Sequence, residues 1–343
     1  MVKIEKRKLQ MTGGSTLIVS IPINWARELG ISHGDEVTLV QQSDKSILLT
    51  AKPRGEQEVS KASINLIPSE PPEDILRLLI AHYLVGYDII RLKTQRGFNT
   101  EDRKWIKETV RQMLIGLEVV EESGDSLVLQ SLLNYTDLTL PSAISSMSKI
   151  VKSMQEDVLE SLLNGDSNLA RDVIQRDNEV DRFYLLVVRQ LKASVRDAEL
   201  AKKIGVENLR DCIGYRLIVK SLERIGDHAA KIAREIVQIK DWDGSSQFTQ
   251  DISEVGKFAQ EVFEQAVDCL SKRDIKVANH TIAEAIKTAD LETKVSEKIL
   301  KSSLDPLEKT CLRSTLESFR RIAEYGADIA EVTINMSIKE PGV

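Results

Sequence analysis

An internal repeat in the C-terminal half of the chain constrains its fold more than any other feature. The segment Leu163–Ala170 recurs 108 positions later as Ser271–Ala278, and each copy holds an aspartate suited to capping the start of a helix. The segment Leu222–Ala233 recurs 97 positions later as Phe319–Ala330. Two segments that recur in the same order indicate a duplicated structural unit whose copies pack side by side.

The repeated segments carry the periodicity of helices. After Pro141, Gly and Pro nearly disappear from segment interiors, and apolar residues follow a 3.6-residue period. We therefore predict two tandem three-helix bundles, over residues 138–240 and 246–338. The helix from Tyr215 shows the clearest seam, with apolar residues at alternating spacings of four and three. These residues are Ile218, Leu222, Ile225, Ala229, Ile232 and Ile236.

The first 54 residues differ in pattern and in charge. They hold eight basic and five acidic residues, a net charge of +3, whereas the whole chain carries −6. Short alternating segments predict a β-rich domain over residues 1–54 that has too little core to stand alone, so we expect it to dimerise. Its elements in order are strands over 4–11 and 16–21, a helix over 24–29, and a hairpin of strands over 36–40 and 46–50.

A small α/β domain is predicted between these two parts, over residues 73–137, after a polar linker over 55–72. The chain is thus predicted to be a multi-domain α+β protein that is mainly α. Nothing in the middle domain resembles a reaction centre. Its elements are helices over 75–84 and 101–115, a strand over 87–92, and a hairpin over 117–120 and 127–132.

Composition limits the class of protein. A chain with 42% hydrophobic and 29% charged residues can bury a core, which excludes intrinsic disorder. Three widely spaced cysteines without a CxxC pair argue against a disulfide framework or a thiolate zinc site. No apolar segment is long enough for a membrane-spanning helix and no signal peptide is apparent. We therefore expect a cytoplasmic protein that does not insert into membranes.

Two pairs of acidic residues form the candidate metal site of the first repeat. Asp177 and Asp181 lie one helical turn apart, as do Glu223 and Asp227, and such like-charge pairs cost about 0.2–0.5 kcal/mol each unless a cation intervenes. On neighbouring antiparallel helices the four carboxylates would share one cation, with His228 as an added nitrogen ligand. The alternative is a solvated acidic face that is neutralised by Arg216, Lys220, Arg224 and Lys231.

The second repeat has lost this pattern. The two aspartates become Ala285 and Ala289 at the 108-residue shift, and Glu223 becomes Arg320 at the 97-residue shift. We therefore expect no second metal site, although Glu324 still occupies the position of Asp227.

Basic residues of the N-terminal domain are candidates for contacts with DNA phosphates across a dimer. Such contacts provide affinity and salt dependence rather than sequence reading. The alternative is a domain that only dimerises the protein. The candidates are Lys3, Lys6, Arg7, Lys8 and Arg27.

Two families resemble parts of this chain. The segments Met11–Thr16, with the following Ile21-Pro22, and Leu29–Val37 resemble the SpoVT/AbrB swapped-hairpin DNA-binding domain. The segment Glu223–Ala229 (Glu-Arg-Ile-Gly-Asp-His-Ala) is close to a signature of the phosphate uptake regulator (PhoU) family, and Arg320–Gly326 is a degenerate copy. The fusion is similar to archaeal-type phosphate regulators.

The PhoU resemblance implies that the acids of the first repeat occupy the family's metal-cluster positions, where iron, zinc, magnesium or manganese would bind. Together the two resemblances imply a dimeric, DNA-binding regulator of phosphate uptake whose bundles sense through metal or a partner. The alternative is a PhoU-type adaptor that docks on a phosphate transporter or signalling protein without binding DNA. No GxSxG, P-loop, GxGxxG or HExxH motif is present, so we expect that this protein is not an enzyme.

Overall fold

The computed structural model describes residues 3–41, 46–50, 59–67, 71–239 and 242–339, which form two compact units. The first unit contains the N-terminal domain, and the second contains residues 59–339. The segment 42–45 between the strands of the second predicted hairpin, the end of the predicted N-terminal domain at 51–54, and residues 55–58 and 68–70 of the predicted linker lie outside the described residues.

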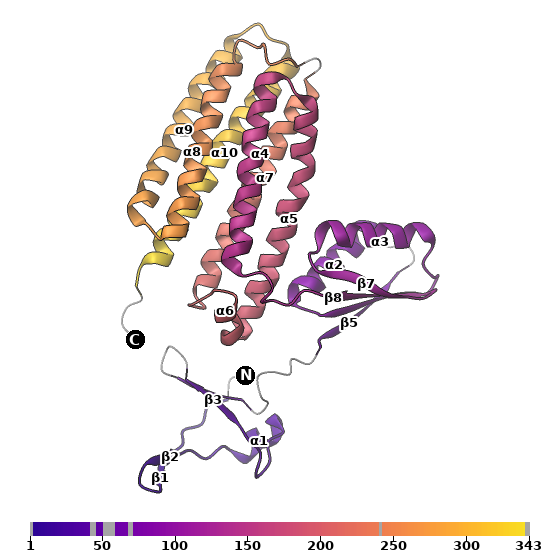
Figure 1. Ribbon diagram of the computed structural model, residues 1–343, viewed down its shortest axis with the longest axis vertical. Coiled ribbons are helices and arrows are strands. Elements are labelled where there is room, and N and C mark those ends of the chain that lie inside the picture. The colour runs from indigo at the N-terminus through magenta and orange to yellow at the C-terminus, as the bar shows by residue number, and fades with distance from the viewer. Residues whose placement is uncertain (1–2, 42–45, 51–58, 68–70, 240–241, 340–343) are drawn as a thin grey trace. The chain divides into compact units, whose positions relative to one another are not determined.

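The N-terminal domain contains two separate hairpins joined by a short helix (Figure 1). Gly13 and Gly14, both with positive φ, make the turn of the first hairpin, and Gly30 ends the helix with a φ of 67°. The predicted order of elements is confirmed, but the first two strands are shorter than the predicted 4–11 and 16–21. The elements are β1 (Gln10–Thr12), β2 (Thr16–Ile18), α1 (Ile23–Leu29), β3 (Thr38–Gln41) and β4 (Ile47–Thr50).

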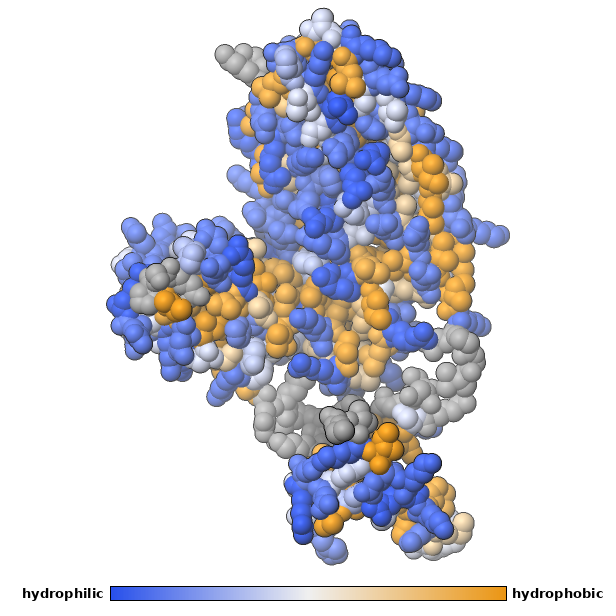
Figure 2. Space-filling model, turned by 180° about the vertical axis from the view of Figure 1, so that it is seen from behind, coloured by the Kyte–Doolittle hydropathy of each residue, from blue (hydrophilic) through white to orange (hydrophobic). Residues whose placement is uncertain are grey.

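This domain has no core of its own among the described residues, because none of them is buried. Apolar side chains on both hairpins are exposed instead, and Figure 2 shows hydrophobic patches on the surface of this domain: Leu17 is 58%, Leu39 is 63% and Ile47 is 68% exposed. Native monomers rarely leave so much apolar surface in contact with water. The exposed side chains favour the predicted dimer, in which they would become buried.

The middle domain is a four-stranded sheet covered by two helices (Figure 1). The strands lie in the order β5-β6-β8-β7, with β5 parallel to β6 and the other neighbours antiparallel. Leu79, Tyr83, Ile90 and Leu92 are among its fully buried core side chains. The elements are β5 (Lys61–Leu66), α2 (Pro72–Val85), β6 (Ile89–Thr94), α3 (Thr100–Met113), β7 (Leu117–Glu122) and β8 (Ser126–Ser131).

Strand β5 corrects the prediction of a linker over 55–72. Residues 61–66 pair in register with 89–94, and Ile64 and Leu66 are buried in the core. The intervening polar residues face solvent, so the segment follows the two-residue period of a half-buried edge strand.

The C-terminal part is a long helical bundle (Figure 1). Asp166 and Asp274 cap the second helix of each repeat, and their carboxylates accept hydrogen bonds from backbone N–H groups, as predicted. The predicted seam residues are all at most 1% exposed. The helices are α4 (Leu140–Asn164), α5 (Ser167–Arg196), α6 (Ala198–Lys203), α7 (Asp211–Gln238), α8 (Thr249–Lys272), α9 (Ile275–Lys301) and α10 (Pro306–Ser337).

The short helix α6 was not predicted. It exists because Asp197 ends α5 and accepts hydrogen bonds from two backbone N–H groups at the start of α6. Within the described part of the chain, none of the helices combines the length and apolar character needed to cross a bilayer.

Arg189 of α5 joins the middle domain to the bundle. Its guanidinium is almost fully buried and donates hydrogen bonds to the carbonyl oxygens of Tyr83 and Tyr87, the latter at 3.1 Å. It also lies 3.5 Å from the carboxylate of Asp88 and stacks over the rings of Tyr83 and Tyr135 at 4.8 and 5.3 Å. These contacts, together with packing of α2 and α3 against α5, fix the middle domain to this helix.

Candidate acidic site between two helices of the first repeat

The four predicted carboxylates lie where α5 and α7 pack against each other. Asp177 and Asp181 come from α5, and Glu223 and Asp227 come from α7. Gly226 allows the close approach of the helices: a Cβ atom at this position would lie 3.2 Å from Val180 and 3.5 Å from Oδ1 of Asp177. We call these four carboxylates the acidic site.

Of the two aspartates of α5 in the acidic site, Asp177 has the larger rise in pKa. Its Oδ1 atom is buried and has no hydrogen-bond partner, whereas Oδ2 lies 3.6 Å from the guanidinium of Arg234. Burial, and then the negative charges of Asp227, Asp181 and Glu223, raise the pKa of Asp177 to about 7, against the opposing effect of Arg234. A carboxyl group in this state holds a proton near neutral pH unless a cation compensates its charge.

The same surroundings raise the pKa of Asp181. Burial raises its pKa to about 6, with contributions from the charges of Glu223 and Asp227 and opposition from Lys220. The carboxylates of the two helices therefore repel each other across the interface, as the sequence predicted.

Basic side chains neutralise part of this charge. The ammonium of Lys220 donates to both carboxylate oxygens of Glu223 at 2.5 and 2.6 Å, and Arg224 bonds to Asp227 at 3.2 Å. Among the residues with described positions, no three His, Cys, Asp or Glu side chains come together as a ready metal group. In this arrangement bases on α7 neutralise Glu223 and Asp227, as the alternative prediction has it, whereas Oδ1 of Asp177 is left without a partner.

The other two bases expected to neutralise the acidic face, Arg216 and Lys231, have different partners. Arg216 donates to the hydroxyl of Tyr184 at 2.6 Å, and Lys231 lies 4.0 Å from Glu317. Arg234 faces Asp177 instead, and sequence analysis missed it. The sequence does hold a sign of this contact. Arg234 follows Asp227 by seven residues, and a spacing of seven residues, or two helical turns, places both side chains on the same face of α7.

The ring of His228, the predicted nitrogen ligand, contacts α10, although the charge of the neighbouring Asp227 also acts on it. Its ring packs against that of Tyr325 on α10, with 5.9 Å between centroids, and its buried Nδ1 has no hydrogen-bond partner. Burial, followed by the charges of Lys231 and Arg321, lowers the pKa of His228 to about 4, so the imidazole is neutral at physiological pH. The structure thus groups His228 with α10 and the four carboxylates with the α5–α7 interface.

Ion pairs occupy the equivalent region of the second repeat. Arg320 pairs with Glu324 and lies 3.9 Å from Glu292, and Arg321 bonds to Glu324 at 2.5 Å. A carboxylate that is already paired in this way offers less to a metal ion than the orphaned oxygen of Asp177.

The predicted DNA-contacting bases are all exposed. Lys3 pairs with Glu28 at 2.5 Å, and Arg7 pairs with Glu5. Among the described residues, Lys6, Lys8 and Arg27 form no ion pair with the acids of this domain.

Comparison with known proteins matches both ends of the chain. The sequence profile of the PhoU domain matches residues 144–236 and 252–333, and that of the bacterial antitoxin MazE, described as antidote-toxin recognition, matches residues 10–57. The middle domain lies outside both matches.

Curated relatives and solved structures agree with the C-terminal match. A phosphate-specific transport system accessory protein PhoU homolog of Pseudomonas aeruginosa is 26% identical over 198 residues, which are 56% of this chain and 80% of that protein. A homolog with the same name from Caulobacter vibrioides is 35% identical over 98 residues, 28% of this chain and 39% of that protein.

Two crystal structures share the fold of the bundles. PhoU from Pseudomonas aeruginosa has a TM-score of 0.51 and 22% identity, covering 57% of this chain and 94% of that one. The PhoU regulatory protein from Streptococcus pneumoniae has a TM-score of 0.50 and 20% identity, covering 57% and 92%. Since the PhoU profile spans just over half of the 343 residues in two consecutive copies, the chain belongs to the PhoU family.

Proposed function

We propose that this protein is a phosphate-responsive transcriptional regulator that binds DNA as a dimer through its N-terminal domain. The observation that carries the proposal is the pairing of a PhoU-type bundle with an antitoxin-like domain that has exposed bases and no core of its own. The curated relatives are named as accessory proteins of phosphate transport, which supports phosphate as the signal. The protein is regulatory rather than catalytic in this proposal.

Dimerisation through the N-terminal domain is the first requirement. We expect sedimentation equilibrium of the full chain to give a mass twice the 38.5 kDa of one chain, because a second copy would cover the apolar faces of both hairpins. The double substitution Leu17→Glu with Leu39→Glu should yield monomers in light scattering, since it buries two charges in that interface.

The matched control is Ile286→Glu, which alters an equally exposed apolar side chain on α9 and should leave the dimer intact. A double variant that remains dimeric would place the interface elsewhere and contradict the proposal.

DNA binding is the second requirement. We expect mobility-shift titrations to show an affinity that falls steeply with salt. Substituting Lys6→Gln and Lys8→Gln should lower the slope of log K against log salt by about one for each phosphate contact removed.

Lys104→Gln with Lys301→Gln removes the same charge from exposed lysines outside the N-terminal domain and should leave the slope unchanged. An intact dimer without salt-dependent binding to any DNA would favour the alternative function, an adaptor that docks on a phosphate transporter or signalling protein.

The acidic site would sense through a metal ion. The orphaned Oδ1 of Asp177 and the raised pKa values of Asp177 and Asp181 fit a site that lacks positive charge. The four carboxylates would hold a divalent cation or iron, which would compensate their charge, and Lys220 and Arg224 would then release their present partners.

A further inference from the structure

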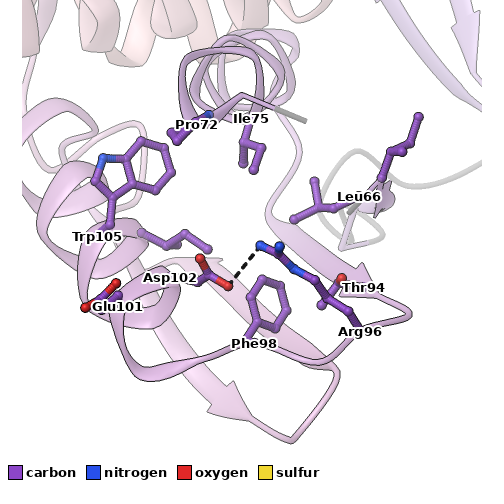
Figure 3. A pocket seen from close by; sticks show the side chains of 11 residues that line it. Leu66, Pro72, Ile75, Thr94, Arg96, Phe98, Glu101, Asp102 and Trp105 are labelled. Atoms are coloured by element: carbon purple, nitrogen blue, oxygen red, sulfur yellow. Dashed lines mark hydrogen bonds and ion pairs between the residues drawn. The ribbon is translucent and has the colours of Figure 1, made fainter. Parts of the chain in front are cut away.

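The middle domain contains a small pocket that no part of the proposed function uses. Its volume is about 190 Å³, and it opens at the carboxyl ends of the parallel strands β5 and β6, beside the first turns of α2 and α3 (Figure 3). Ligands of open α/β sheets bind at this edge, because strand ends and helix N-termini converge there. Pockets for drug-sized molecules are larger, so this volume suits a small metabolite.

Most of the pocket wall is apolar. Figure 3 shows Trp105 on one side, Leu66 on the other, and Pro72 and Ile75 across the open space from a charged pair. Trp105 and Phe98 are only partly buried, so their rings have surface left to contact a ligand. An aromatic and aliphatic lining of this kind selects an apolar group.

One wall of the pocket carries two opposite charges close together. The guanidinium of Arg96 lies 3.3 Å from a carboxylate oxygen of Asp102, and Glu101 adds a second carboxylate to the lining. Arg96 is exposed and makes only this ion pair among the described residues, so it keeps donors free. Asp102 is held in place by the capping box of α3, in which Asn99 bonds to its backbone N–H at 2.7 Å.

We propose that this pocket binds a free α-amino acid with an apolar side chain. Its carboxylate would bind Arg96, its ammonium group would bind Asp102, and its side chain would lie between Trp105, Ile75 and Leu66. An α-amino acid carries its two opposite charges on groups bonded to one carbon atom, which matches the close spacing of Arg96 and Asp102. A simple carboxylate would add an uncompensated negative charge beside Asp102, and a simple amine would add an uncompensated positive charge beside Arg96.

The experiment is calorimetric titration of the full chain with leucine, isoleucine, methionine and phenylalanine. We expect saturable binding of at least one of them, with one site per chain. Analogues of the bound amino acid that lack the amino group or the carboxylate should bind at least about tenfold more weakly, because each loses a charge-assisted hydrogen bond. Glycine, without a side chain, should not compete.

Variants locate the site. Arg96→Gln and Asp102→Asn should each weaken binding by about tenfold or more, and the asparagine retains the oxygen that the helix cap uses. The matched controls are Arg77→Gln and Asp74→Asn, which remove an ion pair of the same type from α2 outside the pocket and should not change binding.

Three outcomes would overturn the proposal: no binding of any of the four amino acids, equal binding of the analogue without an amino group, or equal losses in the control variants. Thermal unfolding of each variant shows whether a loss of binding comes from loss of the fold. None of these outcomes depends on DNA or phosphate, so failure here leaves the proposed regulator function intact.

Discussion

Replacing Asp177 with asparagine is expected to stabilise the metal-free protein by about 2–4 kcal/mol at pH 8. The folded-state pKa of Asp177 is raised to about 7 from a usual value of 3.8, so the folded protein holds a proton between these pH values that the unfolded chain releases. Stability therefore falls as pH rises from about 4 to 7, and the full penalty is present above pH 7. Asparagine cannot ionise and avoids the penalty.

Denaturant unfolding followed by circular dichroism at pH 5 and pH 8, in the presence of a chelator, measures this effect. The matched control is Glu179→Gln, an exposed carboxylate on the same helix that pairs with Arg182, which should change stability by less than about 0.5 kcal/mol. An asparagine variant that is less stable than the wild type at pH 8 would mean that the pairing of Asp177 with Arg234 outweighs the repulsion.

Metal binding is tested in the same samples. A divalent cation or iron should raise the unfolding midpoint of the wild type at pH 8 and should raise that of the Asp177→Asn variant less, because a bound ion stabilises only the folded state that holds it. If no metal shifts the wild-type midpoint, the metal proposal fails, whereas the predicted pH dependence can still hold.

Replacing Arg189 with methionine is expected to destabilise the contact between the middle domain and the bundle by about 3–5 kcal/mol. The substitution removes donors to two backbone carbonyls, the ion pair with Asp88, and the stacking on two tyrosine rings. Methionine keeps most of the volume, so the loss reports on the polar contacts rather than on a cavity.

Hydrogen exchange shows which elements of the Arg189→Met variant have lost stability. We expect faster exchange in α2 and in the β6–β8 pairing, together with a lower unfolding midpoint. Arg171→Met, an exposed position on the same helix, should stay within about 0.5 kcal/mol of the wild type. Unchanged exchange in the middle domain of the Arg189 variant would show that other contacts hold the two parts together.

Local patterns predicted most of the helices and the acidic site, because their signals lie within a few residues of each other. Asp166 and Asp274 marked helix starts, and the spacing of four residues placed Asp177 and Asp181 on one face. Strand β5 was missed because Lys61, Ser63 and Asn65 hide the two apolar residues that it buries. Its strand character depends on pairing with β6, which lies more than twenty residues further along the chain.

Contacts between distant segments could not be predicted. In the sequence nothing distinguishes Arg189 from the other charged residues of α5, because its partners lie about a hundred residues earlier in the chain. The prediction placed His228 with the acids because it adjoins Asp227, but neighbouring residues on a helix point about 100° apart. The pocket of the middle domain is formed by four elements and has no local sequence signal.

The thirty residues of α5 form one continuous helix about 45 Å long, which carries Asp177 and Asp181 in one part and Arg189 about 12 Å further along. The same helix thus contributes to the acidic site and anchors the middle domain through Arg189. Any displacement of α5 at its middle-domain end would alter the separation between its aspartates and the acids of α7. If such a coupling exists, uptake of a proton or a cation between α5 and α7 would in turn alter the position of the middle domain by the same free energy.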